Sequence, residues 1–330
     1  MKKLFFLLAC VAMSVLSFGQ DNQLVWANGH LLYGTPIESI DSLTYDEMQD
    51  IDTLHLLLPR TLIKVVHDTV YIHDTVYIET DCGEDTPSAD IGTFSVSADK
   101  QVTFSKGNLQ YHPANDEWRF AESQTDYIGD ANSNISSTYN GWLDLFGWST
   151  SATNFGVNTS TDYNDYSGSF VDWGMNTIGE DAPNTWRTMT KDEWNYLLNT
   201  RTNASDLKGI AQVNGVNGLI LLPDNWSCPV GVAFKSGFHG SSGVDYYAAY
   251  QTFTADQWSK LEAAGAVFLP AAGNRNGSSV GAVQDGGNYY WAATEGFSLY
   301  AYDLYFAPFD ASMHYDYRYV GLSVRLVKDL

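Results

Sequence analysis

Residues 288–327 read NYYWAATEGFSLYAYDLYFAPFDASMHYDYRYVGLSVRLV, and this stretch decides how the rest of the chain is interpreted. Eight tyrosines lie between Tyr289 and Tyr319, out of 21 in the whole protein. Core strands favour Val, Ile and Leu, whereas a Tyr side chain combines an apolar ring with a polar tip. The clustering indicates a contact surface carried on a scaffold that begins far upstream. The alternative is that these rings pack against one another inside the domain.

Alternation within this stretch predicts strands. Tyr305 and Phe306 lie in an alternating run, in which we expect Phe306 to be core. In the final GLSVRLV, Leu322, Val324 and Leu326 fall on one face of a strand, and Ser323 and Arg325 fall on the other. The residues expected to be exposed for binding are Phe297, Tyr300, Tyr302, Asp303, Phe309, Asp310, His314 and Asp316.

Two helices are predicted upstream from capping boxes. TKDEWNYLLNTR begins at Thr190 with Glu193 three residues on, and TADQWSKLEAAGA begins at Thr254 with Gln257 three residues on. In such a box each side chain satisfies a free backbone amide of the other residue. Each helix then carries a tryptophan, Trp194 or Trp258, which we expect to anchor the core.

Short strands and long loops fill the rest of residues 91–330. FSVSADKQVTFSKGNLQY predicts a hairpin at residues 98–100, VNGVNGLILLPDNW a turn and a strand ending at Pro223, and AVFLPAAGNRNG a strand ending at Pro270. Residues 115–179 are rich in Gly, Asn, Ser and Asp and predict long loops. GWLDLFGW within them is too apolar to lie on the surface.

The N-terminal residues predict export. Residues 1–19 carry Lys2 and Lys3 before an apolar run that is too short for a membrane span, as in a signal peptide. Lipidation at Cys10, in Leu7–Cys10, is the alternative. The mature chain would keep Cys82 and Cys228, for which we expect no structurally important disulfide.

Residues 20–60 predict a small β segment, with strands around the Asn28–Gly29 turn. Residues 61–90 predict an extended stalk and an acidic linker, because HDTVYI occurs twice in tandem from His67 and His73. The six-residue period places equivalent side chains on the same face of an extended chain. A metal site on the two histidines is a less favoured alternative, since metal sites need three or more ligands.

Charge excludes some partners. The net charge of −22 would repel the phosphates of nucleic acids and anionic lipid surfaces. Calcium binding by some of the aspartates is the alternative interpretation of this acidic excess, although no EF-hand pattern occurs. We therefore expect no cofactor.

Catalytic motifs are also missing. The sequence contains no zinc-protease, nucleophile-elbow or phosphate-loop motif. His239 lies near Ser241 and Ser242, a spacing more typical of a Gly-rich loop than of a catalytic pair. We expect no enzyme.

Five motifs that occur along the chain in a fixed order resemble those of a known family. They are WRTMTKDEWNYLLNTR, LPDNW, VFLPAAGNRNG, GNYYWAATE and GLSVRLV. Residues 91–330 resemble the C-type-lectin-like domain of exported Bacteroides-type bacterial proteins. Related groups are the Fibrobacter succinogenes major paralogous domain, the formylglycine-generating-enzyme-like fold and the variable proteins of retroelements.

The resemblance implies an α+β fold in which the terminal strands pair, two helices flank a small twisted, mostly antiparallel sheet, and long loops carry function. It also implies a binding face in the C-terminal segment, where Tyr and Asp give the contact chemistry of antibody loops. The oxidase branch needs a cysteine pair, whereas the domain contains Cys228 alone. The calcium motifs of sugar-binding lectins are absent, and residues 223–226 only distantly echo one.

These observations predict an exported binding or adhesion protein whose partner is a protein or glycan at the cell surface. The alternatives are a structural subunit of a surface assembly and, less favoured, a hydrolytic or formylglycine-generating-enzyme-like enzyme.

Overall fold

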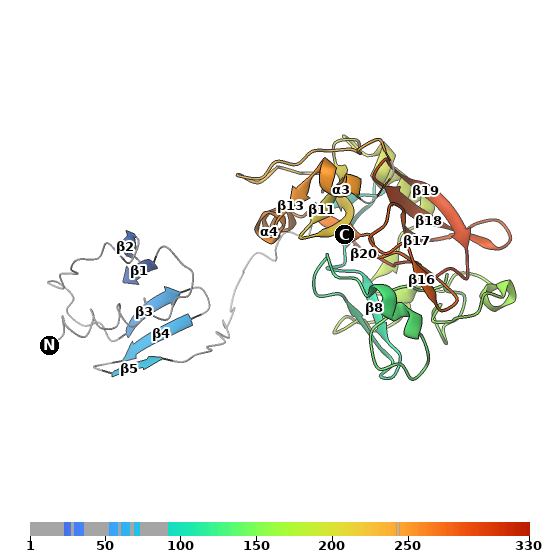
Figure 1. Ribbon diagram of the computed structural model, residues 1–330, viewed down its shortest axis with the longest axis horizontal. Coiled ribbons are helices and arrows are strands. Elements are labelled where there is room, and N and C mark those ends of the chain that lie inside the picture. Colours follow the sequence, from blue (N-terminus) through green and yellow to red (C-terminus); the bar gives the residue numbers. More distant parts are fainter. Residues whose placement is uncertain are drawn as a thin grey trace. The chain divides into compact units, whose positions relative to one another are not determined.

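The computed structural model describes residues 92–241, 243 and 245–330, together with the backbone of five strands further upstream. The chain divides into two compact units, residues 1–84 and 85–330, and each is described by itself (Figure 1). The predicted signal peptide, Cys10, Cys82, the two repeat histidines and the second copy of the repeat lie outside the described residues.

The N-terminal unit contains two antiparallel sheets. β1 (Gln23–Ala27) pairs with β2 (His30–Thr35) on either side of residues 28–29, where a hairpin is expected. β3 (Thr53–Leu58), β4 (Thr61–Val66) and β5 (Thr69–Ile72) form a second sheet in that order. Residues 61–66 and 69–72 therefore differ from the expected extended stalk, because β4 pairs antiparallel with both β3 and β5.

The C-terminal unit is a mixed α+β domain made mostly of strands. Its strands are β6 (Phe94–Ser95), β7 (Gln101–Phe104), β8 (Leu109–His112), β9 (Glu117–Phe120), β10 (Arg187–Thr188), β11 (Lys208–Val213), β12 (Val216–Leu221), β13 (Thr252–Phe253), β14 (Val267–Pro270), β15 (Asn274–Asn276), β16 (Ser279–Gly281), β17 (Asn288–Glu295), β18 (Tyr300–Ala307), β19 (Asp310–Tyr317) and β20 (Leu326–Asp329). Its helices are α2 (Lys191–Asn195), continued by a π-helical turn (Tyr196–Thr200), α3 (Asp245–Tyr250) and α4 (Ala255–Ala263). Three short 3-10 helices occur at Gly129–Asn134, Tyr163–Tyr166 and Trp173–Met175.

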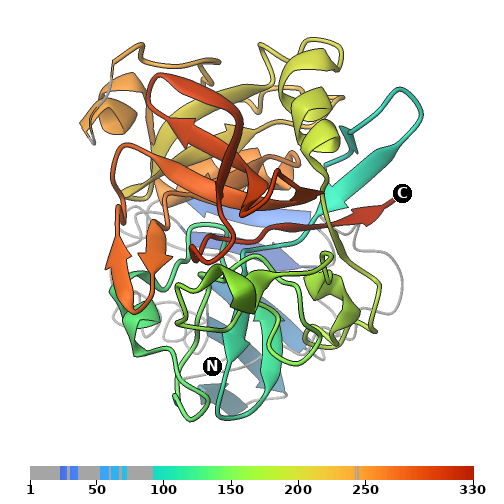
Figure 2. The ribbon, with the colours of Figure 1, turned by 90° about the vertical axis from the view of Figure 1, so that its right-hand side faces the viewer.

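Three sheets organise this domain. Their strand orders are β10-β20-β7-β6, β13-β11-β12-β14 and β17-β18-β19. The last strand, β20, pairs antiparallel with β7, so the two ends of the domain meet; Figure 2 shows the red terminal strand beside the blue-green hairpin. The predicted hairpin at residues 98–100 is present. The turn predicted within VNGVNG lies at residues 214–215, where it joins β11 to β12 as a hairpin, with positive φ at Asn214 and Gly215 as a tight hairpin turn requires.

The predicted final strand is partly confirmed. Leu322, Val324 and Leu326 are buried in one hydrophobic cluster, as the alternation predicts. Ser323 and Arg325 are buried too, because the domain covers the other face of this segment. Burial lowers the pKa of Arg325 to about 10, and its guanidinium donates to Gln124 Oε1 at 2.7 Å.

Both capping boxes are confirmed. Thr190 and Thr254 each accept a hydrogen bond from the backbone of the third helical residue, whose side chain bonds back. Trp194 and Trp258 are buried core anchors, and GWLDLFGW is largely interior. α3 was not expected from the sequence, because it has no capping box.

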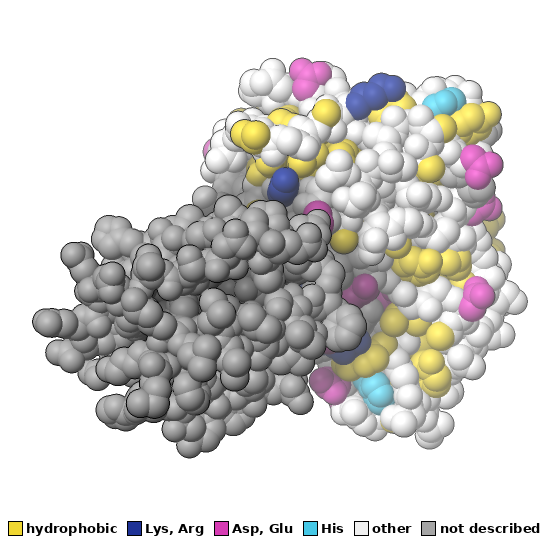
Figure 3. Space-filling view, turned by 60° about the vertical axis from the view of Figure 1, so that its left-hand side comes forward, with side chains coloured by type: hydrophobic (Ala, Val, Ile, Leu, Met, Phe, Trp, Pro, Cys, Tyr) yellow, Lys and Arg dark blue, Asp and Glu magenta, His cyan; other side chains and the backbone are white. Residues whose placement is uncertain are grey.

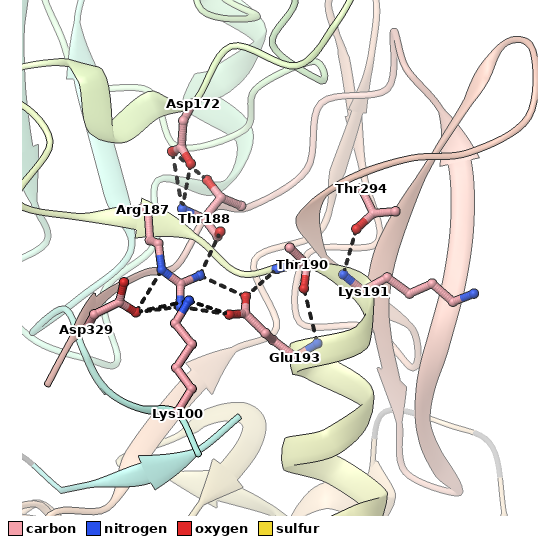
Figure 4. Close-up of polar contacts among 9 residues, drawn as sticks. All are labelled: Lys100, Asp172, Arg187, Thr188, Thr190, Lys191, Glu193, Thr294 and Asp329. Atoms are coloured by element: carbon pink, nitrogen blue, oxygen red, sulfur yellow. Dashed lines mark hydrogen bonds and ion pairs between the residues drawn. The ribbon is translucent and has the colours of Figure 1, made fainter. Parts of the chain in front are cut away.

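Glu193 also belongs to an ionic cluster that joins α2 to the terminal strands (Figure 4). Arg187 binds both oxygens of Glu193, at 2.8 and 2.9 Å, and contacts Asp329 Oδ1 at 2.6 Å. Lys100 lies 3.0 Å from Glu193. On the other side of α2, the backbone amide of Lys191 donates to Thr294 Oγ1 in β17. The helix start is therefore bound directly to β10 and β17, and through Arg187 to β20.

Removing one N-cap tests the local prediction. Thr254→Ala should lower the unfolding free energy by about 1 kcal/mol, because the backbone amide of Gln257 loses the Thr254 hydroxyl that accepts its hydrogen bond. For a domain of this size, this is a fall in Tm of about 2–4 °C. Tryptophan fluorescence can follow it, since every tryptophan except Trp26 lies after residue 85. Thr254→Ser keeps the hydroxyl and should retain the wild-type Tm; an equal loss in both variants would contradict the capping role.

Removing the central cation tests the ionic cluster. Arg187→Met should cost about 1–3 kcal/mol at pH 7, because it strips hydrogen bonds to charged acceptors. Lys328→Met, whose side chain is exposed on β20, is the matched control and should change the free energy of unfolding little.

The cost of Arg187→Met should also depend on pH. Burial alone would raise the pKa of Glu193, but hydrogen bonds, chiefly from Arg187, lower it below 4.5. A hydrogen bond from Arg187 likewise lowers the pKa of Asp329. These carboxylates therefore stabilise the fold at pH values above the pKa values that they have in the unfolded chain. That stabilisation is lost as the pH falls and the carboxylates become protonated. The difference between wild type and variant in chemical denaturation should narrow below about pH 4.5; a difference that is constant down to pH 3 would oppose this account.

Candidate functional site

The β17-β18-β19 sheet holds most of the predicted binding residues. β18 and β19 form a hairpin around residues 308–309, with Ala307 opposite Asp310. Successive side chains of β18 point to opposite faces. Tyr302, Leu304 and Phe306 therefore lie on one face, and Asp303 and Tyr305 lie on the other.

The first face packs into the domain. Leu304, Phe306 and Tyr290 are fully buried in the main core cluster, which confirms Phe306 as a core residue. Tyr302 lies at the margin of this cluster, where the Lys191 ammonium sits 4.2 Å from its ring centroid. Because Leu304 and Phe306 are buried in the core, the side chains available to form a site are those on the second face and those at the strand ends.

Aromatic rings contact one another at the end of the sheet opposite the β18–β19 hairpin turn. We call this group the aromatic cluster; it consists of Tyr163, Phe297, Tyr300, Tyr315, Tyr317 and Tyr319. Tyr300 stacks on Tyr317 at 4.5 Å between centroids, and Phe297 lies 5.0 Å from Tyr300. Phe297 is 59% exposed and Tyr315 is 42% exposed. Of the eight tyrosines between Tyr289 and Tyr319, only Tyr290 is buried.

A buried arginine fixes the backbone beneath this cluster. Arg318 donates to the carbonyl oxygens of Tyr300 and Gly168, each at 3.1 Å. Its guanidinium lies 4.5 Å from the Trp148 ring centroid and pairs with Glu295. The start of β18 is thereby tied to the loop that carries Tyr163, and the rings sit on a rigid support.

The second face of the sheet carries a polar group. Asp303 lies directly opposite His314, and Asp316 follows two residues later on β19. Burial raises the pKa of Asp303 to about 6, interaction with Asp303 raises the pKa of His314, and burial raises the pKa of Asp316. The rings of Tyr289 and Tyr305 each lie 6.1 Å from the His314 ring.

The predicted site residues thus separate into groups. Phe297 and Tyr300 join the aromatic cluster, and Asp303, His314 and Asp316 come together on the opposite face. Phe309 and Asp310 lie at the hairpin tip, apart from both groups. The expected exposure of Asp303 is wrong: its side chain is completely buried, because the second face is partly covered by the domain.

Sequence reasoning missed several members of the aromatic cluster. Tyr315, Tyr317 and Tyr319 belong to the run that suggested a surface, and their spacing of two residues was the available signal. Tyr163 comes from a distant loop, and nothing in the sequence links it to this sheet.

A cleft of about 780 Å³ lies elsewhere in the domain. Phe104, Phe120, Trp186 and Val267 give it an apolar lining. Some of its polar side chains are engaged with one another, for example Gln124 with Glu262 at 2.9 Å. The sheet is the better candidate site, because its aromatic rings contact one another and three potential ligand side chains converge on it.

Other groups considered in the sequence have structural surroundings. The His239 ring stacks on Tyr246 at 4.2 Å, and its Nδ1 bonds to no described residue. Asp224, in the residue 223–226 turn, accepts from Ser95 and Arg201 and so braces the strand end. Cys228 is a free, exposed thiol. Acidic side chains are spread singly over the face drawn in Figure 3, as expected if their charge serves to keep the protein soluble.

Comparison with protein-family models, with curated proteins and with solved structures found no significant match. Within the described residues, no helix has the length and apolar character needed to cross a bilayer.

Proposed function

We propose that this chain is an exported cell-surface binding or adhesion protein whose C-terminal sheet presents a ligand-binding face. The observation that carries the proposal is the aromatic cluster, in which contacting rings remain open to solvent. Scattered exposed apolar residues are normal, whereas contiguous ones mark interaction sites. Export rests on the charged and apolar start of the sequence.

The rings favour a protein or glycan as the ligand. Tyrosine supplies a large contact area at low cost in conformational entropy, and its hydroxyl adapts to different hydrogen-bond partners. Tyrosine is also enriched among the few residues that contribute most of the binding energy at protein interfaces. The cluster stands on a frame fixed by Arg318, so little ordering is needed when a ligand binds.

The proposal includes a C-type-lectin-like fold for residues 91–330. Pairing of β7 with β20, two capped helices and small, mostly antiparallel sheets support it. A binding face in the segment that precedes GLSVRLV is also what this resemblance implies. We propose no catalytic role, and turnover in a broad substrate screen would argue for the enzyme alternative.

A second candidate function is a structural subunit of a surface assembly. Its support is β5, which lies in the first copy of the HDTVYI repeat and at the edge of its sheet. An edge strand presents unpaired backbone groups that can pair with another chain.

The triple variant Phe297→Ala, Tyr300→Ala, Tyr315→Ala tests the binding proposal. Ligand capture on a glycan array or from surface-protein fractions should fall at least tenfold, because the central rings of the cluster are removed. Partly exposed side chains contribute little to folding, so Tm should fall by only about 2–4 °C.

Tyr139→Ala is the matched control, since no ring contact links Tyr139 to the cluster among the described residues. Unchanged capture by the folded triple variant would refute the binding face. A collapse of Tm would instead show that the rings serve to hold the domain together.

Deleting residues 67–78 separates the two candidate functions. A binding protein should lose no ligand capture, whereas an assembly built through β5 should dissociate in multi-angle light scattering. Loss of both properties would point to a general folding defect, which circular dichroism would reveal.

A further inference from the structure

The polar group on the second face of the sheet has the composition of a metal site. One ligand atom each from Asp303, His314 and Asp316 can be chosen so that all three lie within 4.8 Å of one another. We propose that these three residues bind a divalent transition-metal ion of the zinc class. The inference does not depend on the proposed binding function.

The first argument is the strand register. Asp303 and His314 face each other across an antiparallel pair, and Asp316 occupies the next position of the same face of β19. Directly opposite side chains have Cβ atoms about 4.5–5.5 Å apart. Two adjacent strands therefore hold three ligands in fixed positions without any loop.

The second argument is the state of Asp303. Its side chain is 0% exposed, yet neither carboxylate oxygen has a hydrogen-bond partner among the described residues. The nearest cationic candidate is His314, whose Nδ1 lies 3.7 Å from Asp303 Oδ2, which is too far for a hydrogen bond. A buried carboxylate without a donor is costly and calls for an explanation. A cation between these side chains supplies one.

The third argument is distance. A tetrahedral zinc ion with ligands at about 2.0–2.2 Å separates them by about 3.4 Å. The separation of 3.7 Å between His314 Nδ1 and Asp303 Oδ2 is close to that value, and Asp316 offers an oxygen within 4.8 Å of a ligand atom of each of the other two residues. The backbone amide of Tyr317 already donates to Asp316 Oδ1 at 3.0 Å, which leaves the other oxygen for the metal. Such outer hydrogen bonds commonly orient metal ligands.

The ligand types decide between metals. Calcium takes six to eight oxygen ligands, whereas this group offers three residues, one of them an imidazole. Imidazole and carboxylate together suit zinc and its neighbours. The His314 side chain is 50% exposed, so water can complete the coordination.

Isothermal titration of the chelator-stripped full-length chain with zinc chloride tests the inference, without any partner present. One equivalent should bind, and His314→Ala or Asp316→Asn should weaken that binding at least about 100-fold. Both replaced side chains are partly exposed, so the variants should fold, as circular dichroism can verify. A zinc-edge anomalous peak between Asp303 and His314 should appear in crystals of the loaded wild type.

Two controls exclude other zinc ligands. Asp310→Asn, on the same strand, and the double variant His67→Ala, His73→Ala should leave the one-equivalent binding intact. The inference is overturned if no saturable binding occurs or if the ligand variants bind zinc as wild type does. It is also overturned if binding is lost in the repeat-histidine variant, or if calcium binds at these residues in place of zinc.

Discussion

The pairing of β18 with β19 is the constraint on which the candidate sites depend. Side chains alternate along each strand, so a slip of one residue would exchange the two faces of the sheet. Burial of Leu304 and Phe306 in the main core excludes that slip, because the alternative register would expose both. The same register places Asp303 opposite His314 and Tyr300 opposite Tyr317. One hydrophobic requirement thus arranges both the aromatic cluster and the polar group.

The rest of the domain holds this sheet in place. β20 closes the domain by pairing with β7, and the ionic cluster around Arg187 joins those strands to the start of α2. The same helix start is hydrogen-bonded to β17 through Thr294. Glu193 serves both the capping box and the ionic cluster, so a local sequence motif also carries a long-range connection. A frame of this kind permits rings to stay at the surface without collapsing into the core.

Features determined by neighbouring residues could be predicted from the sequence. The capping boxes at Thr190 and Thr254, the Asn214–Gly215 turn and the core position of Phe306 all follow from local spacing, and the structure contains them. The class of mixed α+β domain was also accessible, although the finer lectin-like assignment stays a proposal. The expected stalk differs because the pairing of β4 with β5 depends on contacts that a repeat pattern does not reveal.

Features that depend on distant contacts could not be predicted. The Tyr- and Asp-rich composition of the segment suggested that Asp303 is exposed, but its side chain is fully buried, and only the tertiary structure shows this. The approach of Asp316 to Asp303 requires the β18–β19 register, and the contribution of Tyr163 requires a loop more than a hundred residues upstream. The sequence therefore indicated the right segment, while the grouping of its residues into two sites required the fold.

The central claim is that the sheet register leaves the aromatic cluster open to solvent, while the neighbouring rings of Tyr290 and Phe306 are buried. Hydroxyl-radical footprinting with mass spectrometry measures this directly, one residue at a time. The account predicts rapid oxidation of Phe297 and Tyr315 and strong protection of Tyr290 and Phe306. Equal protection of all four side chains would contradict it, because the cluster would then be part of the core.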